Sequence, residues 1–325
     1  MNILIFSKAV LPVVAYGGTE RVVWDLGEAL EELGHHIWWL SPKESKFRKG
    51  THIPYNPKKD LNSQIPPQVD IVHLHCETQE KLNFPYVITI HGKTPPGKAF
   101  DKNSIFISYD QARRCGSTIF VHNGLNWNNY PKPDLSNNRD RFHFLGKAAW
   151  KVKNVKGAIQ IAQKAKERID ILGGTRLNFK MGFRLTLTPK ARFHGMIGGE
   201  KKFSVLNQSK GLIFPVRWHE PFGLAVIESL WFGAPVFGTP YGSLPELITD
   251  EIGYLSKHSS DLVNAIQDSE RYCRKRCHSY AGDSFNNRTM AQKYLKLYEK
   301  VALGGTLNPI HPICTQLGQS LLPFE

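Results

Sequence analysis

Residues 215–248 read PVRWHEPFGLAVIESLWFGAPVFGTPYGSLPELI, and this segment carries the clearest indication of the fold class. An apolar run ends at Pro215, a polar loop carries Glu220, and an apolar helical pattern begins near Phe222 and Gly223. The order strand, loop, helix is typical of a βαβ unit in a parallel sheet. The first backbone N–H groups of such a helix, together with the helix dipole, favour an anion such as a diphosphate. We therefore expect an anion-binding loop here.

A second carboxylate, Glu228, lies eight residues after Glu220 and inside the predicted helix. Val226, Ile227 and Leu230 flank it, so we expect it at the edge of a packed helix face. A carboxylate accepts several hydrogen bonds, and a vicinal diol such as a ribose has hydroxyl groups to donate them. Glu228 is therefore a candidate ligand for a sugar diol.

The rest of the chain alternates short apolar runs with helical patterns, which indicates an α/β protein. The stretch NWNNYPKPDLSNN, 126–138, is rich in Asn and Pro and predicts a linker between two α/β domains. The predicted strands are 2–6, 37–40, 70–75, 86–91, 105–108, 117–124, 141–146, 169–174, 191–195, 210–215 and 234–239. The predicted helices are 19–33, 154–168, 222–233 and 284–302.

The composition is that of an ordinary globular protein, with 41% hydrophobic and 22% charged residues among 325. This length predicts about two domains. No apolar run approaches the roughly 20 residues of a membrane-spanning helix, and the N-terminus has the pattern of a buried strand, not of a signal peptide. Five scattered cysteines predict a reducing, cytoplasmic setting without a disulfide framework. Cys273, Cys277 and His278 lack a second ligand pair, so we expect no metal cluster there.

The net charge of +14 is concentrated in the second half of the chain. Residues 1–137 hold 15 Lys and Arg against 13 Asp and Glu, whereas residues 138–325 hold 27 against 15. Such an asymmetry favours an anionic partner, and a phosphate-bearing ligand, a nucleic acid or an acidic membrane surface would each satisfy it. A basic surface without a specific partner is the remaining explanation.

The sequence resembles the retaining, nucleotide-sugar-dependent glycosyltransferases of family 4, among the glycosyl transferases group 1. The resemblance runs from GGTER at 17–21 to GYLS at 253–256, and its core is EPFGLAVIE followed by GAPVFGT. It implies the GT-B fold, in which two Rossmann-like domains face each other across a deep cleft. On this basis residues 1–137 form an acceptor-binding domain and residues 138–283 a nucleotide-sugar-binding domain. Residues 284–325 form a helix and tail that cross back to the first domain.

The resemblance assigns donor-binding roles to five residues around the two glutamates. It implies that Glu220 contacts hydroxyls of the donor sugar and is a catalytic residue, and that Glu228 contacts the ribose. It also implies that the backbone of Phe222, Gly223 and Leu224 approaches the diphosphate or the sugar.

The family also has a basic pair early in its second domain, usually an arginine followed about six residues later by a lysine. In FLGKAAWKVKN, 144–154, Lys147 stands in place of the arginine and Lys153 in place of the lysine. Lys156 and Gly157 match the family's usual dipeptide but lie further along, and Lys153 keeps the register of the following helix. A lysine at position 147 keeps the charge but loses the bidentate phosphate geometry of arginine. The resemblance thus implies that Lys147 and Lys153 bind the donor and that Lys153 is catalytic.

In the first half, Gly17 and Gly18 separate the first strand from a helix, and glycine lets a ligand approach the backbone closely. The resemblance implies that they line the cleft near the donor phosphates and the acceptor. Glu20, just inside this helix, either compensates the helix dipole or contacts the acceptor. His91 ends a strand, where open α/β sheets bind ligands, and the resemblance implies a catalytic role beside the transferred sugar.

Two further histidines, His73 and His75, alternate with apolar residues in the predicted strand 70–75. This pattern is typical of a structural strand, so we expect both to be structural residues. SYDQARRCG at 108–116 stands where the family has a helix that starts with Ser-Glu, and Tyr109 replaces the acidic residue or its neighbour.

The resemblance implies transfer of a hexose-type sugar from a UDP- or GDP-linked donor to a hydroxyl of a glycan, glycolipid or small molecule, with retention at the anomeric carbon. Polysaccharide or lipopolysaccharide biosynthesis is the expected setting. The chain has no Asp-x-Asp dyad, so we expect neither a metal nor another cofactor. A sugar-nucleotide epimerase or hydrolase remains the alternative. A nicotinamide-dependent oxidoreductase lacks its Gly-x-Gly-x-x-Gly motif here, and no nucleic-acid-binding motif is present.

The segment 43–59 is a candidate contact with an anionic membrane. Phe47 and Tyr55 within it are candidates for entering the membrane interface. A solvated loop without a partner is the alternative, and we expect a cytoplasmic protein that is either free or peripheral at the membrane. The basic residues of the segment are Lys43, Lys46, Arg48, Lys49, Lys58 and Lys59.

Overall fold

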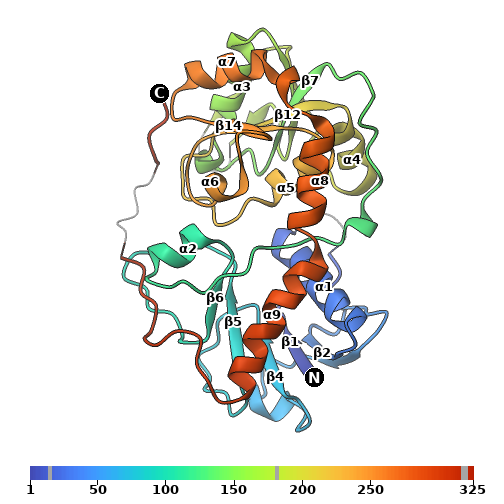
Figure 1. Ribbon diagram of the computed structural model, residues 1–325, viewed down its shortest axis with the longest axis vertical. Helices are drawn as coiled ribbons and strands as arrows, with labels where there is room; N and C mark the ends of the chain where they lie inside the picture. Colours follow the sequence, from blue (N-terminus) through green and yellow to red (C-terminus); the bar gives the residue numbers. More distant parts are fainter. Residues whose placement is uncertain (14–16, 180–182, 316–320) are drawn as a thin grey trace. The chain divides into compact units, whose positions relative to one another are not determined.

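The computed structural model describes residues 1–13, 17–179, 183–315 and 321–325, and these form two compact units. Unit 1 consists of residues 1–127 and 285–318, and unit 2 of residues 128–284 and 319–325 (Figure 1). The predicted linker thus begins where the first unit ends. The long helix near the end of the chain belongs to unit 1, although unit 2 precedes it in the sequence.

Unit 1 contains a parallel sheet of six strands in the order β3-β2-β1-β4-β5-β6. This is the strand order of doubly wound dinucleotide-binding folds. The strands are β1 (Asn2–Phe6), β2 (His36–Ser41), β3 (Thr51–Pro54), β4 (Ile71–Leu74), β5 (Tyr86–Ile90) and β6 (Ser104–Phe106). The helices are α1 (Gly18–Glu32), α2 (Tyr109–Arg114) and α9 (Asn287–Ala302), with a short 3-10 turn at Asn62–Gln64; a second turn, Trp127–Asn129, lies at the boundary of the two units.

Helix α1 forms because its apolar residues recur at helical spacing, and Val22, Leu26, Ala29 and Leu30 are all buried. Helix α9 covers the sheet beside it and contacts β4 and β5.

The strand predictions differ from the structure at two segments of unit 1. The predicted strand 117–124 is wrong: in this segment only an isolated bridge from Phe120 to Phe106 is present. Strand β3 was missed because its sequence, THIP, is short and half-exposed and ends in a proline at the sheet edge.

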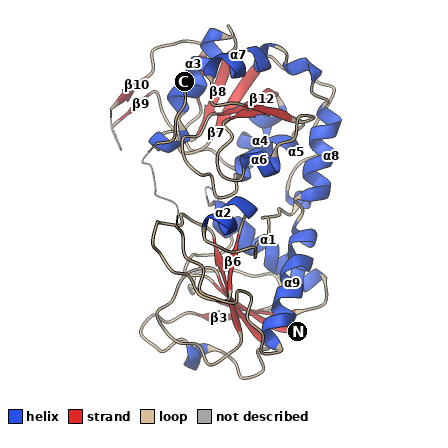
Figure 2. Ribbon diagram, turned by 60° about the vertical axis from the view of Figure 1, so that its left-hand side comes forward, coloured by secondary structure: helices blue, strands red, loops and turns tan. Residues whose placement is uncertain are grey.

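Unit 2 contains a second parallel sheet of six strands, in the order β11-β8-β7-β12-β13-β14. Figure 2 shows both sheets in red with helices in blue beside them. The strands are β7 (Arg141–Leu145), β8 (Arg168–Leu172), β11 (Ala191–Phe193), β12 (Ser209–Phe214), β13 (Val236–Gly238) and β14 (Gly253–Leu255). The helices are α3 (Val155–Lys164), α4 (Gly199–Asn207), α5 (Leu224–Trp231), α6 (Leu244–Leu247), α7 (Ser259–Gln267) and α8 (Arg274–Ser284), with 3-10 turns at Lys151–Lys153 and Ser269–Arg271.

A small antiparallel pair, β9 (Leu177–Asn178) and β10 (Arg184–Leu185), extends from unit 2 and was not predicted. The two parallel sheets confirm the expected α/β class.

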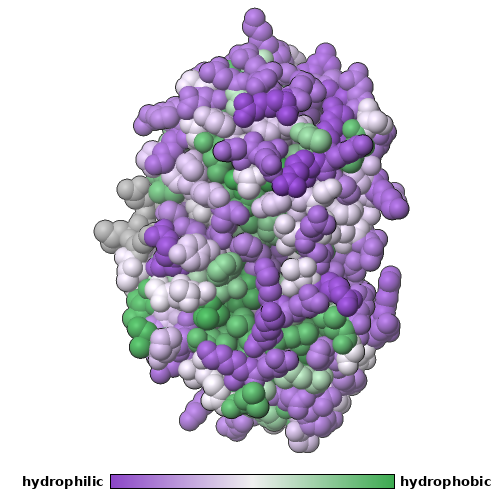
Figure 3. All heavy atoms as spheres, viewed as in Figure 1, coloured by the Kyte–Doolittle hydropathy of each residue, from purple (hydrophilic) through white to green (hydrophobic). Residues whose placement is uncertain are grey.

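On the face drawn in Figure 3, unit 2 is mainly hydrophilic and larger hydrophobic patches lie over unit 1. All five cysteines are free. Among the described residues, none of the helices is both long and apolar enough to cross a membrane.

Candidate functional site

The first part of the site is an ion pair at the carboxyl edge of the second sheet. Lys153 lies in the 3-10 turn after β7, and Glu220 lies in the loop after β12. Lys153 Nζ is 2.6 Å from Glu220 Oε2, although the two residues are 67 positions apart. Their side chains are only 13% and 7% exposed, so the pair is largely withdrawn from water. The structure therefore brings together the two residues that the resemblance assigned to donor phosphate and donor sugar.

Two tryptophans complete this arrangement. Trp218 Nε1–H donates to the same Glu220 oxygen at 2.8 Å, and Lys153 Nζ lies 5.0 Å from the centre of the Trp218 ring. Trp150 meets Trp218 edge to face, with ring centres 6.4 Å apart. The exposed Lys147 places its Nζ 5.3 Å from the Trp150 ring centre. Both tryptophans were missed by the sequence analysis, although each stands in one of the two loops that it singled out.

A tight turn after β13 fixes the loop that carries Glu220. The Ser243 N–H donates to the Glu220 carbonyl at 2.9 Å, and Ser243 Oγ donates to the Phe222 carbonyl at 2.5 Å. Gly242 has a φ of +66°, and a Cβ there would lie 2.3 Å from the backbone of Glu220. Only glycine permits this approach. The Gly in TPYGS therefore sets the position of Glu220.

The loop leads directly into helix α5. Gly223 has a φ of +99° and caps the helix, whose first residue is Leu224. The Phe222 side chain is buried, and this burial anchors the turn in unit 2. The first N–H groups of a helix have no partners within it and favour an anion. The predicted helix start is confirmed, whereas contact of this backbone with a diphosphate stays a prediction.

Glu228 lies inside α5 and is 2% exposed. Its Oε1 accepts a hydrogen bond from the Tyr130 hydroxyl at 2.8 Å and forms an ion pair with Lys202 of α4. Lys202 is itself buried, and Tyr130 packs on Phe203 with ring centres 4.8 Å apart. Neither partner was predicted, because no motif links these positions. A ribose at Glu228 would share the carboxylate with these two donors, and the ribose assignment stays a prediction.

In unit 1, His91 follows β5 and His75 follows β4, at the carboxyl edge of the first sheet. His75 Nδ1 and His91 Nε2 are 2.9 Å apart and share a hydrogen bond. Burial lowers the pKa of His91 to about 4 and the pKa of His75 well below its usual value. Both imidazoles are therefore neutral near pH 7.

His73 is fully buried and has partners on both ring nitrogens, as expected of a structural residue. Its Nε2 is 2.7 Å from Thr89 Oγ1, and its Nδ1 is 2.6 Å from the Tyr298 hydroxyl of α9. Tyr294 of the same helix lies 2.9 Å from Thr89 Oγ1. This network ties helix α9 to strands β4 and β5.

The glycine turn of unit 1 is described from Gly17 onward, and residues 14–16, which include part of the quoted motif, lie outside the described residues. Gly17 is extended and Gly18 begins α1. Glu20 lies in the first turn of α1, and a Cβ on Gly17 would lie 2.6 Å from its Oε2. This position suits dipole compensation, and contact with an acceptor remains the alternative.

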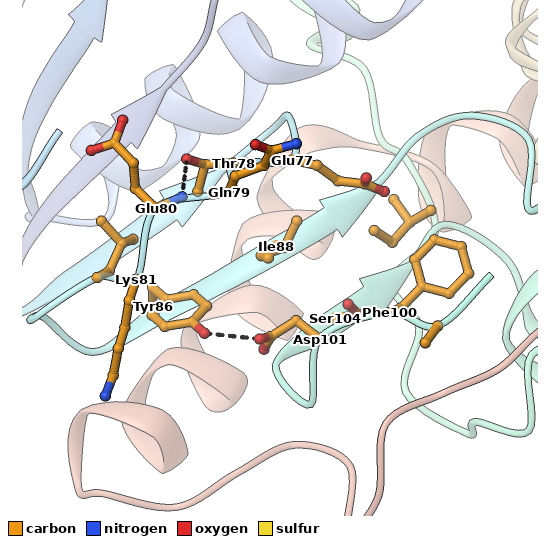
Figure 4. A pocket seen from close by; sticks show the side chains of 13 residues that line it. Glu77, Thr78, Gln79, Glu80, Lys81, Tyr86, Ile88, Phe100, Asp101 and Ser104 are labelled. Carbon is orange, nitrogen blue, oxygen red and sulfur yellow. Dashed lines mark hydrogen bonds between the residues drawn. The ribbon is translucent and has the colours of Figure 1, made fainter. Parts of the chain in front are cut away.

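Unit 1 also has a cavity of about 370 Å³, and Gly17, Gly18 and Glu20 are not among its lining residues. The loop after β4 and the strands β5 and β6 line it (Figure 4). The Tyr86 hydroxyl donates to Asp101 Oδ2 at 2.8 Å across its floor. Burial raises the pKa of Tyr86 to about 12. The sequence-predicted site residues are not among those that line this cavity.

The aromatic residues of the basic segment 43–59 pack against unit 1. Phe47 stacks on Trp39 and Trp24, with ring centres 4.5 and 5.5 Å apart, and Tyr55 meets Phe6 at 4.9 Å. All six basic side chains of the segment are exposed. The basic side chains, not these rings, are therefore the part of the segment that can meet an anionic surface.

Among the described residues, no group of three or more His, Cys, Asp or Glu could hold a metal ion.

Comparison with known proteins supports the fold. The family model described as Glycosyl transferases group 1 matches residues 139–269. A glycosyltransferase involved in avilamycin A biosynthesis, AviGT4, superposes with a TM-score of 0.75 at 18% identity, covering 94% of this chain and 99% of that chain. HepE of Anabaena, solved with UDP and glucose, gives 0.65 at 16% identity, covering 92% and 100%.

One curated relative is named as an uncharacterized 41.2 kDa protein in the cps region of Klebsiella pneumoniae. It is 23% identical over 114 residues, which span 33% of this chain and 32% of that protein. Identities this low show the fold and not the activity. The predicted resemblance is confirmed at this level: the chain has the GT-B fold of glycosyltransferases, and the segment that carries Lys153, Glu220 and Glu228 matches the glycosyl transferases group 1.

Proposed function

We propose that this protein is a retaining glycosyltransferase of family 4 that moves a sugar from a UDP- or GDP-linked donor to a hydroxyl acceptor. The observation that carries the proposal is the Lys153–Glu220 pair, held with Trp218 beside the start of α5. A cation, a carboxylate and free helix N–H groups in one place suit a ligand that joins a diphosphate to a polyol. The complexes of HepE with UDP and UDP-glucose support a nucleotide-sugar donor.

In this proposal Lys153, Lys147 and the N–H groups at the start of α5 meet the diphosphate. Glu220 accepts hydrogen bonds from sugar hydroxyls, and Glu228 from the ribose. The bond between the anomeric carbon and the phosphate oxygen breaks, and the acceptor oxygen bonds to the same face of that carbon. The acceptor proton passes to the leaving diphosphate. The protein contributes by positioning the reactants and stabilising the departing charge, without a metal ion.

The acceptor is a hydroxyl of a glycan, a glycolipid or a small molecule. The proposed setting is polysaccharide or lipopolysaccharide biosynthesis. The involvement of AviGT4 in avilamycin A biosynthesis is the reason to include small-molecule acceptors in the test. The proposed setting is cytoplasmic, with peripheral attachment to the membrane where the acceptor is lipid-linked. We propose no role in nucleic-acid binding.

Donor identity is tested by thermal shift, because a ligand that binds only the folded state raises its stability. A panel of UDP, GDP and ADP sugars is screened with the wild type and with Lys153→Ala. The account predicts that one class of donor raises the melting temperature and that Lys153→Ala reduces the shift. Turnover with that donor then separates the candidates: a glycosylated acceptor supports transfer, whereas free sugar or an epimerised nucleotide sugar indicates a hydrolase or epimerase.

Membrane attachment is tested by flotation with anionic vesicles. Each basic residue near an anionic leaflet contributes about 1 kcal/mol, so the six exposed basic residues of segment 43–59 suffice for reversible attachment. A variant neutralised at all six should stay in the dense fraction while the wild type floats at low salt. Equal flotation of the two would assign the attachment to another surface, and no flotation of either would place the acceptor in solution.

A further inference from the structure

The histidine pair of unit 1 contains a residue that neither the motif comparison nor the proposed function uses. His75 and His91 follow neighbouring parallel strands, β4 and β5, and their side chains meet at 2.9 Å between Nδ1 of His75 and Nε2 of His91. This contact occupies Nε2 of His91. Only Nδ1 of His91 remains to contact a substrate.

We propose that His75 is a positioning residue: it donates its Nδ1 proton to His91 Nε2 and thereby makes His91 Nδ1–H a hydrogen-bond donor toward the transferred sugar. The identity of the substrate as a sugar rests on the proposed function. The hydrogen bond from His75 to His91 and the resulting tautomer of His91 can be tested without turnover. It also revises the expectation that His75 is purely structural.

The direction of the hydrogen bond follows from the protons available. Burial keeps both imidazoles neutral, so each ring carries one proton and has one bare nitrogen. Either His75 Nδ1–H donates and His75 Nε2 is bare, or His91 Nε2–H donates and His75 carries its proton on Nε2. His75 Nε2 is buried and has no hydrogen-bond partner among the residues that the structure describes. Most buried side-chain donors in proteins have a hydrogen-bond partner, which favours the bare nitrogen and the first arrangement.

The His75 ring is also held from the other side. Its centre lies 3.9 Å from that of His73, whose two nitrogens are tied to Thr89 and Tyr298. A ring with a fixed neighbour and a fixed hydrogen bond has little freedom to turn. The orientation of His91 is therefore set by a chain of contacts that reaches back to α9.

The assignment has a chemical consequence for the proposed reaction. A neutral His91 with its proton on Nδ1 donates to an oxygen of the sugar and has no basic nitrogen facing the acceptor. His91 therefore does not remove the acceptor proton. This agrees with the proposed transfer of that proton to the leaving diphosphate.

Three variants test the positioning role. His75→Phe keeps an aromatic ring but removes the hydrogen bond, and should lower kcat/KM about tenfold, the effect of one lost hydrogen bond. His75→Asn places an amide N–H near the position of the imidazole Nδ1 and should restore activity to within about threefold of the wild type. Thr89→Val removes one hydrogen bond of His73, which supports His75 only through a ring contact, and should lower kcat/KM by less than His75→Phe does. In a His91→Phe background, His75→Phe should have no further effect.

Nitrogen NMR of the histidine-labelled full chain tests the tautomer without any substrate. Signals of the two rings are assigned by their loss in His91→Phe and His75→Phe. The proposal predicts that His91 carries its proton on Nδ1 in the wild type and loses this preference in His75→Phe. A proton on His91 Nε2 in the wild type, or equal activity of His75→Phe and the wild type, would overturn it. Failure to find any glycosyl transfer, with the predicted NMR result, would count against the proposed function alone.

Discussion

The carboxyl edges of the two sheets present opposite kinds of chemistry. In unit 1 the edge carries His75 and His91, two neutral rings joined by a hydrogen bond. In unit 2 the edge carries Lys153 and Glu220, an ion pair largely withdrawn from water. The same strand order thus supports a neutral site in one unit and a charged site in the other.

This difference indicates which kind of ligand group each edge can bind. A cation attracts a diphosphate over several ångströms, and the attraction strengthens where water is excluded. A neutral imidazole attracts no anion at a distance and acts only through a short, directional hydrogen bond. The charged edge of unit 2 is therefore suited to binding an anionic group, and the neutral pair of unit 1 to orienting an uncharged polar group through a hydrogen bond. Most of the excess positive charge of residues 138–325 lies on residues 138–284, which belong to unit 2, and this agrees with an anion-binding edge there.

The largest expected effect concerns Glu228, whose removal leaves the buried Lys202 without its carboxylate. Glu228→Ala should lower the stability of unit 2 by about 3–5 kcal/mol, the usual cost of breaking a buried ion pair. It should also weaken binding of both the donor and the free nucleoside diphosphate. Denaturant unfolding and calorimetry measure the two effects.

Tyr130→Phe is the matched control for Glu228→Ala. It removes one hydrogen bond to the charged Glu228 and leaves the ion pair, so it should cost about 1.5–3 kcal/mol. Unchanged nucleotide affinity in Glu228→Ala would contradict the ribose assignment, whatever the change in stability.

A second prediction uses pH to separate the units. In folded unit 1 burial lowers the pKa of His91 to about 4 and the pKa values of His73 and His75 well below 6.5. In unit 2 burial lowers the pKa of His143 to about 3. On unfolding, each ring regains its usual pKa, so stability is complete above pH 6.5 and falls as the pH drops toward 4. Each ring contributes a slope of up to about 1.4 kcal/mol per pH unit.

Three rings in unit 1 against His143 in unit 2 predict that unit 1 loses protection first on acidification. Hydrogen exchange of peptides from β4 and β5, compared with β7 and β12 between pH 7 and 5, measures this. Equal loss of protection in the two sheets would show that the buried imidazoles do not control the acid sensitivity of unit 1.

The third and smallest effect concerns Lys153 itself. Lys153→Ala removes a charged hydrogen bond to the proposed diphosphate, so kcat/KM should fall by a factor equivalent to about 1.5–3 kcal/mol. Lys151→Ala, an exposed lysine of the same turn, is the control and should behave as the wild type. Steady-state kinetics with the donor found by thermal shift measure both. Equal values for the two variants would remove Lys153 from the site.

Much of unit 2 could be predicted because its signals are local. A glycine before α5, an apolar helix and a strand on either side define the loop that carries Glu220. The pairing of Lys153 with Glu220 could be expected only from the resemblance, since nothing in the sequence alone joins positions 67 apart.

The partners that were missed depend on tertiary contacts. Lys202 lies on a helix with no motif, and Tyr130 lies in a segment read as a linker, yet both meet Glu228. His75 was judged by the alternation of its strand, which says nothing of the residue at the end of the next strand. The segment 117–124 is apolar enough for a strand but forms only the Phe120 bridge in the sheet. Composition measures how readily a segment forms a strand, not whether a partner strand lies beside it.

The central claim is that the charged edge of unit 2 holds a nucleotide sugar for transfer with retention and without a metal ion. The most direct measurement is proton NMR of the glycosylated product, formed with the donor selected by thermal shift and in the presence of EDTA. The account predicts full turnover and a product with the same anomeric configuration as the donor. An inverted product, or turnover that EDTA abolishes and Mg²⁺ or Mn²⁺ restores, would contradict it.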